Sequence, residues 1–337
     1  MALYIIFLFP IIVYLLNYIF KKKLLLLNYT GKKHQKFAMK DEIPLSGGII
    51  LLICMISIFS NNIILSICLF SIFFVGLSSD TQLINSPKIR FFFQIIVLLL
   101  ATYFLNLEIL NTRINFLDLI IKNKFFSFFF VIFCILIVVN GTNFIDGLNT
   151  NVLGYYLILS FCIYTQNFHQ LLGIENLEWK IWIYCLFVLY LFNFFKKLFI
   201  GDSGSYLLGF FYSYILIKVF SINPSISPFY IILLLWYPCF EILFSIVRKI
   251  NFSQSPLNPD TNHLHQIFFS LIKKLIKNKY VDSNTLAANI INLYNLVTFF
   301  FSSLYIYNSK YQICLILLNL ISYTFIYLLI MRKIKRI

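Results

Sequence analysis

The few acidic residues of this chain gather in short polar loops rich in Gly, Asn and Ser. The clearest are the segments Asn140-Gly-Thr-Asn-Phe-Ile-Asp-Gly147 and Gly201-Asp-Ser-Gly-Ser205. Each lies at the end of an apolar stretch, so its carboxylate falls where a membrane meets water. Mg²⁺ takes one or two protein carboxylates and leaves its other positions to water and substrate phosphates. The pattern therefore indicates metal and phosphate chemistry at a membrane surface rather than simple passage through the membrane.

The composition sets the fold class. Of the 337 residues, 61% are apolar and 12% are charged, and the mean hydropathy is +0.88. Water-soluble globular domains are nearer half apolar and a quarter charged. We therefore expect an all-α integral membrane protein. Because no linker, repeat or soluble segment is evident, residues 1–337 are predicted to form a single domain.

Eleven apolar runs have about the length that crosses the hydrocarbon core of a bilayer. They cover approximately residues 3–20, 46–60, 62–78, 89–105, 125–140, 151–165, 181–195, 205–222, 229–247, 286–307 and 312–331. The split near Asn61-Asn62 matters most, because losing it would invert every span that follows.

The distribution of Lys and Arg gives an independent prediction of topology, since cytoplasmic loops carry the excess. If the cluster at Lys21 is cytoplasmic, the segments on that side hold 20 of the 27 basic residues and the opposite loops hold five. This asymmetry predicts eleven spans, an outside N-terminus and a cytoplasmic C-terminus. The net charge of +15 then reflects topology and affinity for anionic lipid, and nucleic acid is not expected as a partner.

With this topology, one aspartate in each of four polar segments falls on the cytoplasmic side. These are Asp80, Asp146, Asp202 and Asp260. Because they come from separate parts of the chain, they can converge on one site. A cluster of this kind suits a substrate that carries a nucleotide diphosphate.

Each constellation also has a simpler structural interpretation. Asp202 or Ser203 can merely cap the helix predicted from residue 205; alternatively, backbone N–H groups near the paired glycines approach phosphate while Asp202 holds a metal. Asn140, Asn143 and Asp146 recur every three residues and share one face if the helix continues through them. That face suits either interhelical hydrogen bonds or contact with substrate.

The C-terminal half adds an intramembrane carboxylate and two histidines. Glu241 lies inside an apolar run, where a carboxylate is by default a functional hypothesis, and Pro238 just before it is expected to kink the helix. Glu241 and Arg248 are two turns apart and cannot pair directly. The i, i+2 spacing of His263 and His265 matches no zinc motif, so we expect them beside a phosphate. An amphipathic basic helix is predicted at about residues 267–279.

Taken together and in order, these motifs resemble those of the polyprenyl-phosphate N-acetylhexosamine-1-phosphate transferases. This is the glycosyltransferase family 4 group, which also includes the phospho-N-acetylmuramoyl-pentapeptide transferase. The resemblance covers about residues 28–266 and rests on Ile43-Pro-Leu-Ser-Gly-Gly48, Gly76-Leu-Ser-Ser-Asp80, Asn140 to Gly147, Phe199-Ile-Gly-Asp-Ser-Gly-Ser205, Pro238 to Arg248 and Pro259-Asp-Thr-Asn-His-Leu-His265.

The resemblance implies transfer of a sugar 1-phosphate from a UDP-N-acetylhexosamine to a polyprenyl phosphate such as undecaprenyl phosphate, with release of UMP. It implies Mg²⁺ as cofactor, with Mn²⁺ as a substitute, the cytoplasmic (inner) membrane as location, and a lipid-linked glycan such as O-antigen or teichoic acid as product. A homodimer is left open. Alternatives are the peptidoglycan enzyme type, a catalytically silent homologue, and a transporter, although a transporter would place its charges near the bilayer midplane in related halves.

The resemblance also implies roles for individual residues. Asp202 and Asp80 correspond to metal-site positions, and the catalytic set is Asp80, Asp146, Asp202, His263 and His265. The residues expected to bind substrate are Lys33, His34, Asn140, Asn143, Gly201, Ser203, Ser205, Arg248 and Asp260.

The chain departs from the family pattern at several of these positions. Ser79 stands where many members have the first of two aspartates, so a group that would deprotonate the lipid phosphate has no obvious counterpart. Asn149-Thr150 replaces Asp-Gly, Thr261 replaces Arg, and Gln266 replaces a further His. We expect these changes either to tune the sugar pocket or to mark an unusual subgroup.

Overall fold

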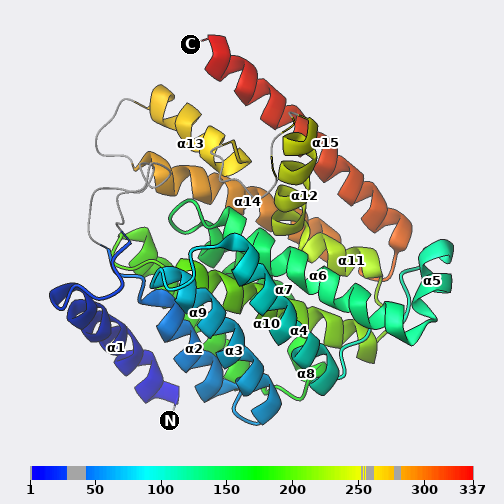
Figure 1. Ribbon diagram of the computed structural model, residues 1–337, viewed down its shortest axis with the longest axis horizontal. Helices are drawn as coiled ribbons and strands as arrows, with labels where there is room; N and C mark the ends of the chain where they lie inside the picture. The colour runs from blue at the N-terminus through cyan, green and yellow to red at the C-terminus, as the bar shows by residue number, and fades with distance from the viewer. Residues whose placement is uncertain are drawn as a thin grey trace.

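The structure is a computed structural model that describes residues 2–28, 43–251, 253, 255, 262–276 and 282–336 (Figure 1). Across these residues the chain is helical, and an isolated bridge between Leu27 and Pro44 is its only β contact. The helices are α1 (Ala2–Lys22), α2 (Gly47–Ile58), α3 (Ile63–Asp80), α4 (Pro87–Phe104), α5 (Asn115–Ile121), α6 (Lys124–Ile145), α7 (Asn151–Thr165), α8 (Phe168–Leu171), α9 (Asn176–Phe194), α10 (Gly201–Ile222), α11 (Pro228–Leu234), α12 (Trp236–Asn251), α13 (Leu264–Leu275), α14 (Ser283–Ser303) and α15 (Ser309–Arg336).

Each of the eleven predicted apolar runs contains a helix or a bent pair of helices, and the break near Asn61-Asn62 is present between α2 and α3. Among the described residues, seven helices are long and apolar enough to cross a membrane: α3, α4, α6, α9, α10, α14 and α15. The bent pair α11 and α12 would add an eighth, and α2 and α7 are shorter apolar helices. The chain is thus a helical membrane protein, while eleven crossings and the side of each terminus stay predictions.

Successive long helices alternate in direction, which brings distant loops together at each end of the bundle. At one end, called here the site end, Asp80 at the end of α3 meets the first turn of α10, and Lys196 forms a 3.0 Å ion pair with Asp282. At the opposite end, Arg113 donates hydrogen bonds to the carbonyl oxygens of Ser225 (2.7 Å) and Tyr307 (3.1 Å). The antiparallel order therefore places the predicted acidic segments at one end.

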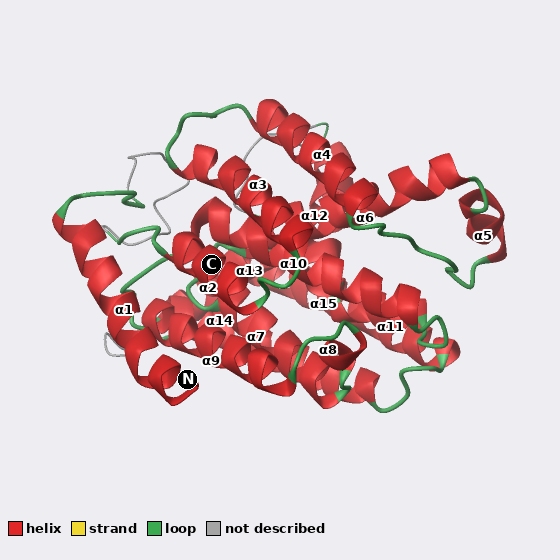
Figure 2. Ribbon diagram, turned by 90° about the horizontal axis from the view of Figure 1, so that it is seen from below, coloured by secondary structure: helices red, strands yellow, loops and turns green. Residues whose placement is uncertain are grey.

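Helix α10 is the central element of the bundle, and it packs against α2, α3 and α6 (Figure 2). Glycines let it approach its neighbours closely. A Cβ on Gly76 of α3 would lie 2.4 Å from the Cα of Ser203, and one on Gly48 of α2 would lie 2.7 Å from the backbone nitrogen of Gly204. Real side chains cannot occupy such positions. These contacts fix the start of α10 beside the end of α3.

The α11 and α12 axes meet at 78°, and the break falls at Leu235 rather than at Pro238 as expected. Pro238 instead lies in the first turn of α12, where a missing backbone N–H costs little. The start of α12 packs closely on α6, since a Cβ on Gly141 would lie 2.2 Å from the carbonyl oxygen of Pro238. The bend thereby carries Glu241 and Arg248 away from the main helix direction.

Two predicted boundaries are wrong. The helix expected from residue 205 begins at Gly201, so the Gly-Asp-Ser-Gly-Ser segment is its first turn and not a loop. The basic amphipathic helix expected from residue 267 begins at Leu264 and ends at Leu275; residues 277–281 lie outside the described part of the chain. In addition, the short helix α5, which was not predicted, lies at the edge of the molecule (Figures 1 and 2).

Candidate active site

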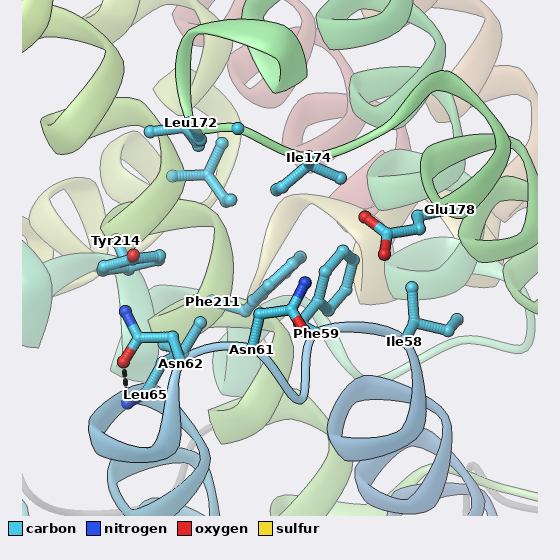
Figure 3. A pocket seen from close by; sticks show the side chains of 12 residues that line it. Ile58, Phe59, Asn61, Asn62, Leu65, Leu172, Ile174, Glu178, Phe211 and Tyr214 are labelled. Carbon is cyan, nitrogen blue, oxygen red and sulfur yellow. Dashed lines mark hydrogen bonds between the residues drawn. The ribbon is translucent and has the colours of Figure 1, made fainter.

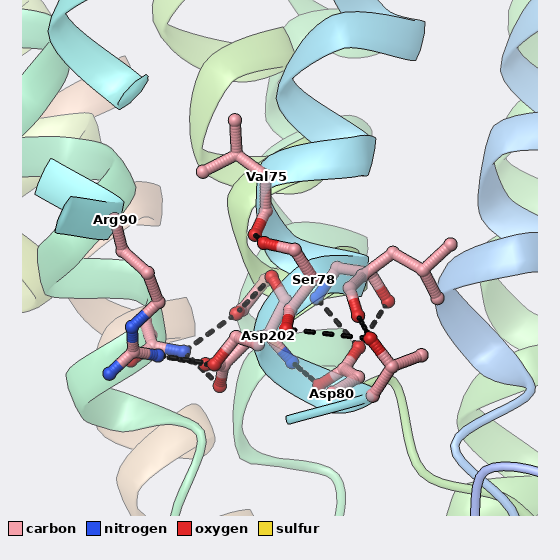
Figure 4. Close-up of polar contacts among 11 residues, drawn as sticks. Val75, Ser78, Asp80, Arg90 and Asp202 are labelled. Carbon is pink, nitrogen blue, oxygen red and sulfur yellow. Dashed lines mark hydrogen bonds and ion pairs between the residues drawn. The ribbon is translucent and has the colours of Figure 1, made fainter. Parts of the chain in front are cut away.

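Asp202 is the centre of the polar cluster at the site end (Figure 4). Its Oδ2 accepts from Arg90 Nη1 at 2.7 Å and from the Ser79 hydroxyl at 2.5 Å, while its Oδ1 accepts from Asn143 Nδ2 at 2.7 Å. The side chains of Arg90 and Asp202 keep 21% and 28% of their exposure, so a solute can reach them. Helices α3, α4, α6 and α10 each contribute one member of this cluster.

Asp80 anchors the N-terminus of α10. One carboxylate oxygen accepts from the backbone N–H of Asp202 at 2.8 Å, and the other accepts from the N–H and the hydroxyl of Ser203 at 3.0 and 2.6 Å. The N-cap residue of α10, Ile200, supplies no side-chain bond. A carboxylate at a helix start satisfies free donors and complements the helix dipole. Asp80 therefore caps α10 from a different helix.

This arrangement decides between the interpretations of the Gly201–Ser205 segment. Asp202 does not merely cap its own helix, because its carboxylate points toward Arg90, Ser79 and Asn143. The N–H groups expected to approach phosphate are engaged by Asp80 in this structure. Gly201 has φ +68°, and a Cβ there would lie 2.6 Å from a carboxylate oxygen of Asp80. Ser203 is thus hydrogen-bonded to the Asp80 carboxylate, and Gly201 leaves the space that this carboxylate occupies.

Asp146 is the C-cap of α6 and lies partly buried near the other two carboxylates. Burial, followed by the charges of Asp202 and Asp80, raises its pKa well above the ordinary value. Within the described part of the chain, no hydrogen bond to its carboxylate is present. A positive charge beside Asp146 would relieve both its desolvation and the repulsion.

Asn140 and Asn143 both lie in α6, as predicted, but their side chains bond to different partners. Asn143 reaches Asp202 and, at 3.1 Å, the Ser205 hydroxyl. Asn140 instead donates at 2.9 Å to Oε1 of the buried Gln94 on α4. For Asn140 the structure therefore shows interhelical bonding and no contact with the carboxylate cluster.

The loop after Asp146 is held by Asn193 of α9, which accepts from the Thr150 N–H, and by asparagines of α14. The N–H of Asn149 donates to Asn284 at 2.8 Å, the Thr150 hydroxyl donates to Asn289 at 3.1 Å, and Asn292 donates to the Thr150 carbonyl at 3.0 Å. Thr150 is 1% exposed with φ +68°, which is an unusual conformation for a β-branched residue. Thr150 therefore helps to fix the loop, and its side chain makes no contact with the carboxylates.

The two histidines lie against the same α6–α7 segment. His263 is the N-cap of α13, its ring stacks on that of His265 at 5.6 Å, and it contacts the ring of Phe144 at 5.2 Å. A Cβ on Gly147 would lie 2.3 Å from His265 Nε2. Because the capping residue is extended and the next residues are helical, i, i+2 side chains can face one another. Both histidines are thus brought next to the segment that carries Asp146.

Gln266, which stands in place of a further histidine, takes part in helix capping. Its side-chain oxygen accepts from the backbone N–H of His263 at 3.4 Å. This contact is the return half of a capping box. The departure at Gln266 therefore stabilises the start of α13.

The remaining predicted residues are placed elsewhere or lie outside the structure. Arg248 donates to the Tyr327 and Ser245 hydroxyls, each at 3.3 Å, and lies over the Tyr327 ring. These contacts place it between α12 and α15 without linking it to the carboxylates. Four positions fall outside the described residues, namely Lys33, His34, Asp260 and Thr261.

Arg90 is the main site residue that the sequence did not single out. It lies in the first turn of α4, a helix that begins at Pro87 and is otherwise almost wholly apolar. A charged residue at the edge of such a helix is a functional signal. The sequence pattern alone did not show that its guanidinium points to Asp202.

In the described part of the chain, no three His, Cys, Asp or Glu side chains form a ready-made metal site. Mg²⁺ does not need one, because substrate phosphates and water supply most of its ligands. Asp146 and Asp202 fit such an ion. The negative charge of Asp202 acts on the Asp146 carboxylate, and that carboxylate receives no hydrogen bond from any described residue. Asp80 fits less well as a metal ligand because both of its carboxylate oxygens already accept hydrogen bonds from the first turn of α10.

A separate hollow lies at the opposite end of α3 and α10 (Figure 3). Its polar lining comes from Asn61, Asn62 and Glu178, and the rest is largely apolar, including Phe59 and Phe211. None of the described residues predicted for the site lines this hollow.

Comparison with known proteins finds one family model and two similar proteins. The family model described as glycosyl transferase family 4 matches residues 62–220. An undecaprenyl-phosphate alpha-N-acetylglucosaminyl 1-phosphate transferase of Thermotoga maritima is 34% identical over 110 residues, which are 33% of this chain and 36% of that protein. A protein of the same description from Yersinia pestis is 26% identical over 252 residues, or 70% of this chain and 67% of that protein. Over residues 62–220 the chain is thus similar to glycosyl transferase family 4.

Proposed function

We propose that this protein transfers an N-acetylhexosamine 1-phosphate from a UDP-sugar to undecaprenyl phosphate, or a related polyprenyl phosphate, and releases UMP. One observation carries the proposal. Three carboxylates and a guanidinium from four helices, with two histidines nearby, gather at one end of a helical membrane bundle. This collection suits two phosphate groups that meet at a membrane surface.

In the proposed reaction, an oxygen of the lipid phosphate attacks the sugar-linked phosphorus of the donor. A new oxygen–phosphorus bond forms, and the bond from that phosphorus to the bridging oxygen breaks. UMP leaves with the electron pair, and the sugar diphosphate remains on the lipid. Both reactants are anions, so the protein must mainly position them and offset their charge.

The proposed roles follow from the contacts. Asp202 and Asp146 would hold Mg²⁺, which when bound would offset the negative charge of the donor diphosphate. Asp80 fixes the helix that carries Asp202. Arg90 would turn from Asp202 to a phosphate oxygen, for which its planar fork of donors is suited. His263 and His265 would contact the phosphates from the α13 side.

Ser79 does not oblige the protein to be inactive. The second pKa of a phosphate monoester is about 6, so the lipid phosphate is mostly a dianion at neutral pH and needs no protein base. The Ser79 hydroxyl donates to Asp202 and accepts from Arg90. This supports an active enzyme with a hydrogen-bonding residue in place of the acid.

We further propose UDP-N-acetylglucosamine as the donor and a lipid-linked envelope glycan, such as O-antigen or teichoic acid, as the product. The support is the described activity of the two relatives and the Asn140–Gly147 motif. The cytoplasmic face of the inner membrane, where UDP-sugars are made, is the proposed location.

The test is UMP release by purified protein in detergent with undecaprenyl phosphate and a panel of UDP-N-acetylhexosamines, with Mg²⁺ or with EDTA. We expect metal-dependent release with one donor. Folded protein that releases no UMP with any donor would contradict the proposal. Release that persists in excess EDTA would contradict the metal assignment alone.

A further inference from the structure

Glu241 is a carboxylate on α12 that is only 1% exposed, and its hydrogen bonds come from two other segments. One oxygen faces His263 Nδ1 at 3.0 Å and accepts from the backbone N–H of Leu264 at 3.1 Å. The other accepts from the Tyr323 hydroxyl at 2.7 Å. A buried carboxylate is stable only when it is well satisfied in this way. Glu241 therefore joins α12, the start of α13 and α15.

The Glu241 contact determines what the His263 ring can do. Both Glu241 oxygens already accept hydrogen bonds, so the proton between Nδ1 and the carboxylate belongs to the imidazole. A neutral His263 then carries its hydrogen on Nδ1 and keeps Nε2 as the basic nitrogen. The rings of Phe144 and His265 flank it at 5.2 and 5.6 Å. Ring position and tautomer are thus set together.

Tyr323 is itself held in place by aromatic neighbours on α12. Its ring contacts those of Phe240 and Phe244 edge-on, with centroids 4.8 and 5.2 Å away. The ring is only 2% exposed. Tyr323 belongs to α15, which lies outside the stretch matched by the family model. The last helix therefore reaches the site through Glu241.

We propose that Glu241 and Tyr323 are positioning residues that fix the orientation and tautomer of His263 toward the phosphate site. The inference rests on the proposed function, because it assigns His263 to that site. Tyr323 orients Glu241, Glu241 orients His263, and the basic Nε2 of His263 is directed at the substrate.

The first test compares UMP release by Glu241→Leu, Glu241→Gln and Tyr323→Phe. Removing an outer partner of a functional histidine costs about 10- to 100-fold in activity, and we expect this loss in kcat for the Leu variant. The Gln variant keeps an acceptor for Nδ1–H and should recover part of it. Tyr323→Phe removes one hydrogen bond and should cost about fivefold.

Tyr294→Phe is the matched control. Its hydroxyl donates from α14 to Asn319 on α15 at 2.5 Å, so the change removes another tyrosine hydroxyl from a hydrogen bond that involves α15 without touching Glu241. We expect its kcat to match that of the wild type. Equal losses in Tyr294→Phe and Tyr323→Phe would show a general packing effect and overturn the inference.

The second test does not depend on activity. The chain has four histidines, so ¹⁵N-histidine labelling gives a small set of ring signals, and His263→Gln identifies those of His263. We expect an Nδ1–H tautomer in the wild type and in Glu241→Gln, and a mixture in Glu241→Leu. An unchanged tautomer in Glu241→Leu would overturn the inference.

The two tests distinguish failure of the positioning inference from failure of the proposed function. If wild-type protein releases no UMP, the function fails while the tautomer result still reports on Glu241. If wild-type protein is active and Glu241→Leu is equally active, only the positioning inference fails.

Discussion

At the scale of single residues, the sequence showed which carboxylates matter but not what each one does. Asp80, Asp146 and Asp202 were expected together, and the structure brings them to one end of the bundle. Their division of labour depends on contacts across more than 100 positions, such as the bond from Asp202 N–H to Asp80. Local sequence carries no such information. For the same reason, the sequence did not show that Arg90 contacts Asp202, which is 112 positions away.

Asp202→Asn should abolish most of the activity while leaving the protein folded. We expect a loss of about three orders of magnitude in UMP release, since charge stabilisation by a metal contributes several kcal/mol. The partly exposed pair with Arg90 should contribute less than about 1 kcal/mol to stability. Thermal unfolding in the same detergent provides the folding control. A near-normal rate would rule out the metal role of Asp202.

Ser79→Asp should lower the Mg²⁺ concentration needed for half-maximal activity. The new carboxylate would lie beside Asp202, whose Oδ2 is 2.5 Å from the Ser79 hydroxyl, and would increase the negative charge around the ion. We expect a shift of about tenfold, equivalent to about 1.4 kcal/mol. Magnesium titration of UMP release measures it.

Ser78→Asp is the control for this change, because the Ser78 hydroxyl bonds only to the Val75 carbonyl of its own helix at 2.7 Å. It adds the same charge one residue away and should leave the Mg²⁺ requirement nearly unchanged. Complete loss of activity in Ser79→Asp would show that Ser79 itself is needed in this subgroup.

At the scale of elements, hydropathy located the helices well and their ends less well. All eleven apolar runs contain helices, because burial in lipid demands long apolar segments that bond their own backbone. The start of α10 was misplaced by four residues because its cap comes from Asp80 on α3. The break at Leu235 was assigned to Pro238, since sequence does not show how closely Gly141 lets α12 approach α6.

Gly201→Ala should destabilise the protein and reduce its activity. Both Gly201 and Gly173 have positive φ, at 68° and 70°, but a Cβ at Gly173 has no atom within 4 Å. Gly173→Ala therefore measures the backbone strain alone, about 1–2 kcal/mol. Gly201→Ala adds a collision with Asp80 and should cost about 1–3 kcal/mol more. Thermal unfolding and UMP release measure both effects. Equal costs for the two variants would contradict the proposed anchoring by Asp80.

Asp282→Asn should reduce stability at neutral pH only. Burial alone would raise the pKa of Asp282, but hydrogen bonds from Thr285 and Lys196 lower it below its ordinary value. The carboxylate thus stabilises the fold above its unfolded pKa of about 3.9, and this contribution is lost as pH falls through the lower folded pKa. Asn preserves the helix cap. A difference in unfolding temperature that persists at pH 2 would contradict this account.

At the scale of the whole molecule, the sequence predicted an alternating bundle with four aspartate segments at one end. The structure has this arrangement for Asp80, Asp146 and Asp202, while Asp260 lies outside the described residues. Which end faces the cytoplasm follows only from the Lys and Arg asymmetry and stays a prediction. A cysteine-free background with either Lys88→Cys or Lys310→Cys tests it, because both lysines are exposed and lie at opposite ends.

A membrane-impermeant maleimide should label Lys88→Cys only in inverted vesicles and Lys310→Cys only in right-side-out ones. The first residue lies at the site end and the second at the start of α15. Detergent-solubilised protein should label at both positions and serves as the control. The reverse pattern would place the site outside, where UDP-sugars are not made.

The glycine contacts of α10 have a consequence for motion. Gly48 and Gly76 place α2 and α3 so close to Gly204 and Ser203 that these three helices cannot slide without breaking backbone contact. We therefore expect α2, α3 and α10 to behave as a rigid wall in hydrogen exchange. We propose that the lipid acceptor approaches from the other side, past the 78° bend that joins α11 and α12. Admission of the lipid and positioning of His263 would then depend on the same helix.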